Sequence, residues 1–312
     1  MYPRKIALID VGTLKVKVQL REYVSETNMS ILYQTSIRTA LGRDWTNNCI
    51  TDEALQATIK AIKDSVAEMN KFGKYTLQAV GTEALRKADN GQVVLAEIKN
   101  NTGLSLELLS QEKEADLFFK AVGHDFPNRP IVTIDVGGGS AQVVVSNQPH
   151  QSQSFLFPTG TYGVRTEYIN GENPTQAGFL AARQHIFNTL LPLKNVVAEP
   201  AILIVGSTIA LDFFQLVLPA LNLTSQTTIY PNHPLTVTAE TMSELLNKLA
   251  LLPYSDREKL FTPEPAYTWG VDITLLHVLA VCEYLPITEI IPSNHNLSSG
   301  LFINILGTGN DK

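Results

Sequence analysis

The chain has 312 residues, of which 44% are hydrophobic and 17% charged, and its formal net charge is −6. This length exceeds one ordinary hydrophobic core, so the composition indicates a soluble globular protein with two domains. The negative charge argues against a broad nucleic-acid surface. Two cysteines make neither a disulfide framework nor a zinc site, which predicts a reduced chain in the cytoplasm.

Targeting and membrane signals are not expected. Residues 1–12 run directly into a strand pattern that contains an aspartate, so no signal peptide is predicted. No uncharged apolar run looks long enough to cross a bilayer, and no membrane partner is expected.

The chain opens with two alternating strands in residues 4–24, joined at Gly12-Thr13-Leu14. Lys15 and Lys17 share one face of the second strand, where they are either solvated or in contact with an anion such as phosphate. A further strand pattern precedes Arg38. Thr51 is then predicted to cap a helix that runs to Asn70.

The next elements are a strand at Thr76–Val80 and a turn into a helix at residues 81–86. Thr82 is predicted to cap that helix, leaving its N-terminus for an anion. Arg86 either pairs with Glu83 or contacts that anion. These two readings stay open at this point.

A helix at residues 92–100 and a strand at residues 105–109 lead to a helix over residues 111–123. Glutamates in the first turn of a helix usually complement its dipole, and Glu114 is read so from the pattern alone. The proline-rich stretch at residues 124–130 is the best linker. It predicts an N-terminal lobe at 1–128 and a C-terminal lobe at 129–312.

A glycine-rich hairpin at Ile131–Val145 is the strongest motif in the chain. Its turn carries three successive glycines, so consecutive N–H groups can converge on an anion such as phosphate. Asp135, at the end of the first strand, could hold a divalent cation against that anion. Residues 9–12 repeat residues 134–137, which suggests two related lobes that face each other across a phosphate.

The C-terminal half is predicted to continue with a strand at residues 155–157 and a helix from Asn173-Pro174 to Leu191. A strand at residues 201–205 then turns through Gly206-Ser207-Thr208 into a helix whose N-terminus could face phosphate or ribose. Helices at 239–251 and 270–284, a strand at 289–291 and a helix at 297–306 complete the chain. His277 reads as a core histidine, and the six histidines show no metal-ligand spacing.

Five segments, in order, resemble the exopolyphosphatase and guanosine pentaphosphate phosphohydrolase family of the actin/sugar-kinase/Hsp70-like superfamily. They are residues 9–13, 81–90, 110–115, 134–141 and 205–208. The resemblance implies an α/β protein of two actin-like (ribonuclease H-like) lobes with a cleft between them. The last helix is a candidate to cross back to the N-lobe, and a homodimer is expected.

The resemblance also implies the chemistry, which is attack of water on a terminal phosphoryl group. Glu114 matches the family's catalytic carboxylate, and Asp135 and Asp10 match positions that hold Mg²⁺. The implied phosphate-binding residues are Thr13, Arg86, Gly137, Gly138, Gly139, Ser140, Gly206, Ser207 and Thr208. The substrate is linear polyphosphate, guanosine pentaphosphate, or both.

The sequence departs from the family pattern at three places. Gln142 replaces a carboxylate on the metal side, Leu14 replaces a polar residue of the first loop, and Ser298 and Ser299 replace two charged residues. An amide is a weaker ligand than a carboxylate for a hard cation. Two alternatives therefore stay open: a catalytically weak phosphate or alarmone sensor, and a kinase or ATPase of the same superfamily.

Overall fold

The computed structural model describes residues 4–25, 28–42, 48–123, 125–126, 129–148, 151–169, 175–196, 198–230, 232–250 and 252–307. The chain forms two compact units, Met1–Lys113 with Leu301–Lys312, and Glu114–Gly300. The division falls inside a helix, upstream of the boundary at residue 128 that the linker composition predicts. The helix at Leu297–Gly307 contributes to the first unit from Leu301 onward.

The first unit is built on a five-stranded sheet with the order β3–β2–β1–β4–β5. Strands β1 (Arg4–Val11), β2 (Lys15–Tyr23) and β3 (Met29–Arg38) are antiparallel neighbours. Strands β4 (Thr76–Gly81) and β5 (Glu107–Leu108) add in parallel on the other side of β1. The alternating pattern at residues 4–24 therefore predicted the first two strands correctly.

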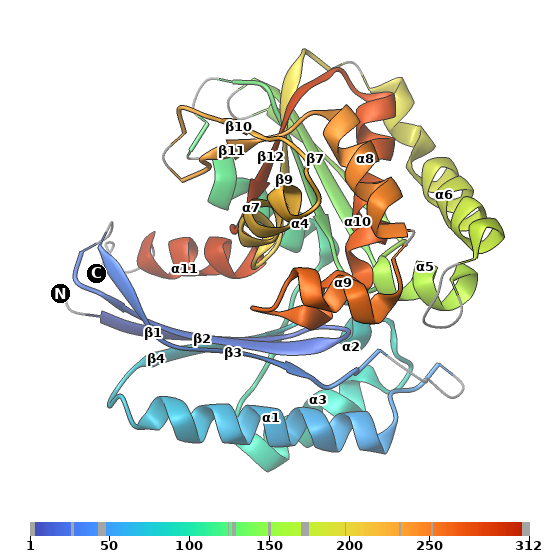
Figure 1. The fold of residues 1–312 in the computed structure, drawn as a ribbon. Coiled ribbons are helices and arrows are strands. Elements are labelled where there is room, and N and C mark those ends of the chain that lie inside the picture. Colours follow the sequence, from blue (N-terminus) through green and yellow to red (C-terminus); the bar gives the residue numbers. More distant parts are fainter. Residues whose placement is uncertain are drawn as a thin grey trace. The chain divides into compact units, whose positions relative to one another are not determined.

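Helices α1 (Asp52–Asn70) and α3 (Gly91–Thr102) pack with one face of this sheet, and α2 (Glu83–Lys87) follows β4 (Figure 1). Alternate residues of β1 and β2 point to this face and join Leu55, Ile59 and Ile62 of α1 in one core. The Thr51 hydroxyl accepts a hydrogen bond from the Ala54 N–H, so the predicted N-cap of α1 is confirmed.

The end of helix α11 (Leu297–Gly307) packs within the first unit. The Phe302 ring lies 6.2 Å from the Tyr23 ring, and the Arg21 guanidinium stands 4.0 Å from its centre. Such a cation–π contact contributes about 0.5–1 kcal/mol at an exposed site and more where it is desolvated.

The second unit repeats the same sheet order, β8–β7–β6–β9–β12. Strands β6 (Ile131–Val136), β7 (Ala141–Gln148) and β8 (Gln151–Phe157) are antiparallel. Strands β9 (Ala201–Gly206) and β12 (Ile287–Ser293) add in parallel beside β6. Each unit is thus an antiparallel three-stranded meander extended by two parallel strands. The remaining strands, β10 (Gln226–Thr227) and β11 (Leu235–Thr236), form a small separate pair.

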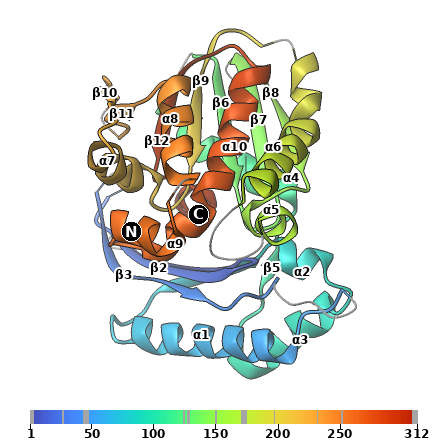
Figure 2. The ribbon, with the colours of Figure 1, turned by 45° about the vertical axis from the view of Figure 1, so that its right-hand side comes forward.

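Buried side chains alternate between the two faces of the second sheet. Leu203 and Val205 join a core with α6 (Gln176–Leu190), α8 (Ala239–Ala250) and α10 (Thr268–Tyr284), which stand in front of the sheet in Figure 2. Ile202 and Ile204 belong to a second cluster with Phe118 of α4 (Gln111–Gly123). Period-two alternation explains why both faces of β9 are buried. The other helices are α5 (Thr161–Tyr168), α7 (Ala210–Ala220) and α9 (Tyr254–Leu260), with short 3₁₀ turns at Leu191–Asn195 and Pro265–Tyr267.

The predicted helix start at Asn173-Pro174 lies outside the described residues. The N-cap of α6 is Thr175, whose hydroxyl accepts a hydrogen bond from the Gly178 N–H. The segment Pro265–Tyr284 is long and apolar enough to cross a membrane by length and composition alone, although it contains Asp272 and Glu283 and so is not an uncharged run. In the structure 56% of its most apolar window is buried inside the unit.

Helix α10 carries a buried carboxylate held by two arginines. Asp272 accepts hydrogen bonds from Arg165 Nη2 at 3.0 Å and from Arg257 Nη1 at 2.7 Å. All three side chains are almost fully buried. Removing one member of such a network leaves an uncompensated charge in the core, so the network couples α5, α9 and α10.

Candidate active site

The two units carry the same hairpin turn after their first strand. In the first unit the Gly12 N–H donates to the Lys15 carbonyl at 3.0 Å, and in the second the Gly137 N–H donates to the Ser140 carbonyl at 2.8 Å. Asp10 is paired across the ladder with Lys17, and Asp135 with Gln142. The repeated strand-Asp-x-Gly pattern in the sequence therefore corresponds to one repeated backbone structure.

The glycine-rich turn of the second unit is held by the start of α5. The Thr161 and Tyr162 N–H groups donate to the carbonyls of Gly137 and Gly138 at 2.9 and 2.7 Å. Gly160 packs directly on the turn, since a Cβ at this position would come within 2.6 Å of the Gly139 and Ser140 backbone. The N-terminus of α5 is thus used to fix the turn rather than to receive a ligand.

Three consecutive amides of this turn take no part in its hairpin hydrogen bonds. Among the described residues, no backbone or side-chain acceptor is found for the N–H groups of Gly138, Gly139 and Ser140. Unpaired successive N–H groups in a turn form a concave anion-binding nest. Gly138 and Gly139 are half-exposed, so an anion arriving from solvent can reach these N–H groups.

The second turn of this unit lies beside Asp135. Strands β6 and β9 are parallel neighbours, and Asp135 is paired with Gly206 at their carboxyl ends. The Ser207 hydroxyl donates to the Tyr267 hydroxyl at 3.1 Å, and Asn296 Nδ2 donates to the Thr208 hydroxyl at 3.2 Å. The hydroxyl groups of Ser207 and Thr208 therefore already have hydrogen-bond partners within the protein.

Tyr267 is a residue of this site that the sequence interpretation missed. Burial, assisted by the negative charges of Glu264 and Asp135 and opposed by the hydrogen bond from Ser207, raises the pKa of Tyr267 to about 12. The hydroxyl thus stays protonated at neutral pH, where it accepts from Ser207 and keeps one proton to donate. No local pattern distinguishes this tyrosine, since it reaches the site from the turn that precedes α10.

Glu114 lies in the first turn of α4 and is half-buried. The Phe118 ring, one turn further on, fills the space where a Cβ of Gly206 would stand, at 2.1 Å. Residues four apart share a helix face, so Glu114 lies on the same face as Phe118. Since α4 leads to the start of β6, its first turn extends past Gly206 toward the end of the sheet that carries Asp135.

In the first unit, Asp10 is a buried carboxylate. Burial raises the pKa of Asp10, against the lowering effect of Lys17, and its Oδ1 atom has no hydrogen-bond partner among the described residues. An orphaned buried carboxylate oxygen is costly unless a cation or a donor occupies the adjacent space. Asp10 therefore fits the predicted role of a metal ligand.

Thr13 is fixed in the turn after Asp10. The Thr13 carbonyl accepts a hydrogen bond from the Gly42 N–H at 2.7 Å, and the Thr13 methyl group fills the space where a Gly42 Cβ would stand. The chain approaches this closely because residue 42 has no side chain. The Thr13 N–H has no acceptor among the described residues, and its phosphate-binding role stays a prediction.

Helix α2 carries Arg86 and begins at the carboxyl ends of β1 and β4. There the Thr82 N–H donates to the Val11 carbonyl at 3.2 Å. The Arg86 guanidinium donates to the Leu109 carbonyl, and Glu83 pairs with Lys87. The predicted capping bond of Thr82 is wrong, because its hydroxyl approaches the Val11 carbonyl at 3.5 Å instead. With five residues, α2 is too short to offer a helix N-terminus for an anion.

The predicted site residues thus form two groups, one in each unit. Asp10, Thr13 and Arg86 lie at the carboxyl ends of β1 and β4 in the first unit. The second unit brings together Asp135, Gly137, Gly138, Gly139, Ser140, Gly206, Ser207 and Thr208, with Glu114 on α4. The roles of these residues, and the cleft between the lobes, stay predictions.

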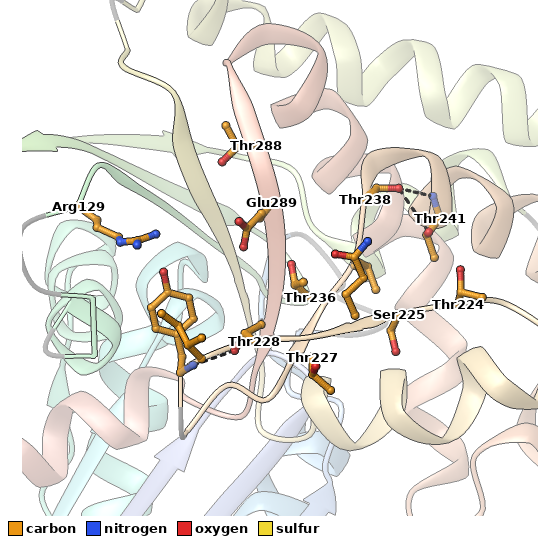
Figure 3. A pocket seen from close by; sticks show the side chains of 14 residues that line it. Arg129, Thr224, Ser225, Thr227, Thr228, Thr236, Thr238, Thr241, Thr288 and Glu289 are labelled. Carbon is orange, nitrogen blue, oxygen red and sulfur yellow. Dashed lines mark hydrogen bonds between the residues drawn. The ribbon is translucent and has the colours of Figure 1, made fainter.

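A cavity of about 360 Å³ in the second unit has a different lining. Threonines dominate its wall, with Arg129 and Glu289 at one end and Thr224, Ser225 and Thr241 toward the other (Figure 3). None of the predicted site residues lines this cavity.

The sheet order and its duplication define the class of protein. Two α/β units, each with an antiparallel meander followed by parallel strands, make an actin-like (ribonuclease H-like) fold, which confirms the predicted fold class. The model of the Ppx/GppA phosphatase family matches residues 5–308, so the chain belongs to that family.

Solved structures agree with this assignment at the level of the fold. An exopolyphosphatase from Cytophaga hutchinsonii superimposes with a TM-score of 0.80 at 20% identity, covering 98% of both chains. The Aquifex aeolicus member of the Ppx/GppA family gives 0.76 at 20% identity, covering 100% of both chains.

Curated relatives match over shorter segments. Exopolyphosphatase 1 of Mycobacterium tuberculosis is 26% identical over 133 residues, which is 40% of this chain and 39% of the relative. A bifunctional 3-dehydroquinate synthase/phosphatase of Fusobacterium nucleatum is 27% identical over 175 residues, which is 52% of this chain and 26% of the relative. The matched segments span well under half the length of either relative.

Proposed function

We propose that the chain hydrolyses the terminal phosphoanhydride bond of linear polyphosphate by attack of water on the terminal phosphorus. The observation that supports this most directly is the turn at Gly137–Ser140, with three successive amides that lack an acceptor among the described residues. Its neighbours are a carboxylate at Asp135 and a second small-residue turn at Gly206. A terminal phosphoryl group has the charge and size that such a nest binds.

Glu114 is the proposed general base. In the proposed step it accepts a proton from water as the new P–O bond forms, and the bridging P–O bond breaks so that the shortened chain leaves with the electron pair. A base must lie within about 3 Å of the water or reach it through one hydrogen bond. The amides of the glycine-rich turn then stabilise the charge that develops on the phosphoryl oxygens.

Asp10 and Asp135 are proposed to hold Mg²⁺. When bound, Mg²⁺ neutralises phosphate charge and orients the phosphoryl oxygens. Carboxylate oxygens are the ligands this hard cation prefers, and the orphaned Oδ1 atom of Asp10 supports the assignment. Arg86 and Thr13 are proposed to contact the phosphate chain.

Release of phosphate from polyphosphate, guanosine pentaphosphate and ATP, measured with and without Mg²⁺, tests the proposal. We expect release from polyphosphate that stops on removal of divalent cations and returns with Mg²⁺. Glu114→Gln should lower turnover about 10²–10⁴-fold, the usual contribution of a general base. Asp116→Asn, which alters an exposed ion pair with Lys120 on the same helix, is the control and should keep turnover.

Two other outcomes would point elsewhere. Hydrolysis of guanosine pentaphosphate but not polyphosphate would move the substrate to the nucleotide. Tight binding without turnover would favour a phosphate or alarmone sensor, the alternative that the buried amide of Gln142 supports. A cytoplasmic location and a homodimer stay predictions.

A further inference from the structure

Three potential metal ligands, none of them among the proposed phosphate-site residues, converge in the second unit. Asp125 follows α4, His233 lies between β10 and β11, and His295 lies between β12 and α11. One ligand atom from each residue lies within 4.8 Å of the other two. Among the described residues this is the only such group of three histidine, cysteine or acidic side chains.

The distances suit a small divalent cation. His233 Nε2 lies 2.9 Å and His295 Nε2 lies 3.3 Å from the same carboxylate oxygen, Oδ2 of Asp125. In a tetrahedral zinc site, metal–ligand bonds of about 2.0–2.1 Å place the ligand atoms about 3.3 Å apart. Both separations from Asp125 Oδ2 are close to this value, and the ligand atoms of the two imidazoles lie within 4.8 Å of each other, so the three groups already surround one ion-sized position.

The surroundings hold the ligands in place. Asn232 Nδ2 donates to the other carboxylate oxygen of Asp125 at 3.3 Å, which turns Oδ2 toward the imidazoles. The Phe126 ring packs 4.9 Å from the His233 ring. Outer contacts that orient ligands raise metal affinity, because less ordering is needed on binding.

The backbone of both histidines is also fixed. The His233 N–H donates to the Tyr230 carbonyl at 2.9 Å, and the His295 N–H donates to the Ser293 hydroxyl at 3.0 Å. The His233 side chain is fully buried, whereas 32% of the His295 side chain is exposed. The site therefore has an anchored ligand inside and a solvent-facing side where an ion can enter and keep a water ligand.

We infer that Asp125, His233 and His295 form a binding site for a first-row transition-metal ion of the zinc type. Two imidazoles and one carboxylate are a donor set that favours such ions over Mg²⁺, which prefers oxygen ligands. The two proposed metal sites thus share no residue and differ in their donor atoms.

The bound ion would join three segments that are far apart in the chain. These three ligands are close together only in the folded chain, so an ion that binds them favours the folded state and would stabilise the second unit. His295 stands two residues after Ser293, whose carbonyl accepts a hydrogen bond from the Ser207 N–H. The ion would therefore also restrict motion at the end of β12, to which the turn at Gly206–Thr208 is hydrogen-bonded.

Equilibrium dialysis of the metal-free, untagged full chain against Zn²⁺, with excess Mg²⁺ to occupy the carboxylate site, tests the inference. The wild type should bind one more equivalent of Zn²⁺ than His295→Ala or Asp125→Asn, or bind it at least ten-fold more tightly, and Zn²⁺ should raise Tm only in the wild type. His185→Ala is the matched control, since it removes a half-buried imidazole on α6 that bonds to Tyr168 instead.

Asp125→Asn keeps the size of the side chain and can still accept hydrogen bonds, so it separates loss of a ligand from loss of packing. Circular dichroism of each variant without metal verifies the fold. If the wild type, Asp125→Asn and His295→Ala bind the same number of Zn²⁺ ions with the same affinity, the cluster is an ion pair alone and the inference is wrong. Because the readout is metal binding, failure of the proposed hydrolysis would leave this result unaffected.

Discussion

Gln142 is the departure from the family pattern that bears most directly on the proposed hydrolysis. It stands directly across the β6–β7 ladder from Asp135, so both side chains project from the same face of the sheet. The Gln142 amide is buried and donates to the Ser140 hydroxyl at 3.0 Å. The sequence-based expectation that the two side chains converge therefore agrees with the strand register, whereas the metal role of this position stays a prediction.

Restoring a carboxylate there should strengthen the metal site. We expect Gln142→Glu to tighten Mg²⁺ binding and raise turnover by roughly 10-fold or more, the effect of one supporting ligand. Turnover of both forms across a Mg²⁺ titration measures it, with Gln142→Met as the uncharged control of similar size. If added charge weakens binding of the anion and turnover does not rise at any Mg²⁺ concentration, the sensor alternative gains support.

Arg86 is expected to act on the substrate more than on the fold. A charge-assisted hydrogen bond to phosphate contributes about 1.5–3 kcal/mol, whereas an exposed ion pair contributes less than about 1 kcal/mol. Arg86→Ala should therefore weaken binding of a short polyphosphate about 10- to 150-fold, as measured by calorimetric titration. Lys87→Ala, which removes the neighbouring cation, should bind almost as well as the wild type.

A second outcome is informative for the same residue. Arg86 also donates to the Leu109 carbonyl, just before α4. If Arg86→Ala binds polyphosphate with unchanged affinity but has a lowered Tm, this arginine stabilises the segment at Leu109 and does not bind phosphate.

At the scale of the element, helix α5 and the glycine-rich turn act as one unit. Two N–H groups of α5 hold the carbonyls of Gly137 and Gly138, and Gly160 touches the backbone on the other side. The unpaired amides of the turn are therefore positioned by a helix, α5, that the sequence analysis did not predict. Preorganised amides stabilise charge without having to reorient during the reaction.

A methyl group on Gly160 should disturb this arrangement. Its Cβ would lie 2.6 Å from Gly139 and Ser140 backbone atoms, so Gly160→Ala should displace the turn, lower stability by about 1–3 kcal/mol and weaken phosphate binding. Urea denaturation and phosphate titration measure both effects.

Gly163→Ala is the matched control on the same helix. No atom lies within 4 Å of a Cβ at Gly163, so alanine should stabilise α5 by about 0.5–1 kcal/mol and leave binding unchanged. Equal behaviour of the two alanine variants would contradict the proposed role of the close contact at Gly160.

At the scale of the whole molecule, a buried histidine should make stability depend on pH. His277 lies in α10, is fully buried, and its Nδ1–H donates to the Ile273 carbonyl at 2.8 Å. Burial lowers the pKa of His277 to about 4, against the hydrogen bond to Ile273, which raises it. This agrees with its sequence-based assignment as a core histidine.

The sign of the effect follows from proton linkage. The unfolded chain takes up a proton near pH 6.5 and the folded chain only near pH 4, so the free energy of unfolding should fall as pH drops through this window and level off below it. The loss from this one group is at most about 3 kcal/mol. Urea denaturation between pH 7 and 4 should show a smaller slope for His277→Leu, and equal slopes would refute the assignment.

The sequence by itself determined the features that depend on neighbouring residues. Alternation predicted β1 and β2, the run of three glycines predicted the hairpin at Gly137–Ser140, and Ser110 with the residues after it predicted α4. Five short segments in order were enough for the family resemblance, because close approach of backbone to phosphate constrains residue type locally.

The tertiary structure decided every feature that joins distant segments. Phe118 fills the space at Gly206, Tyr267 reaches the Ser207 hydroxyl, and the ligands at Asp125, His233 and His295 come from three separate connections. A search for metal-ligand spacing in the sequence found no metal site because these ligands lie 62 or more residues apart and adjoin only after the parallel strands pair. Strand pairing and side-chain packing, rather than local propensity, bring such residues together, and no window of sequence contains that information.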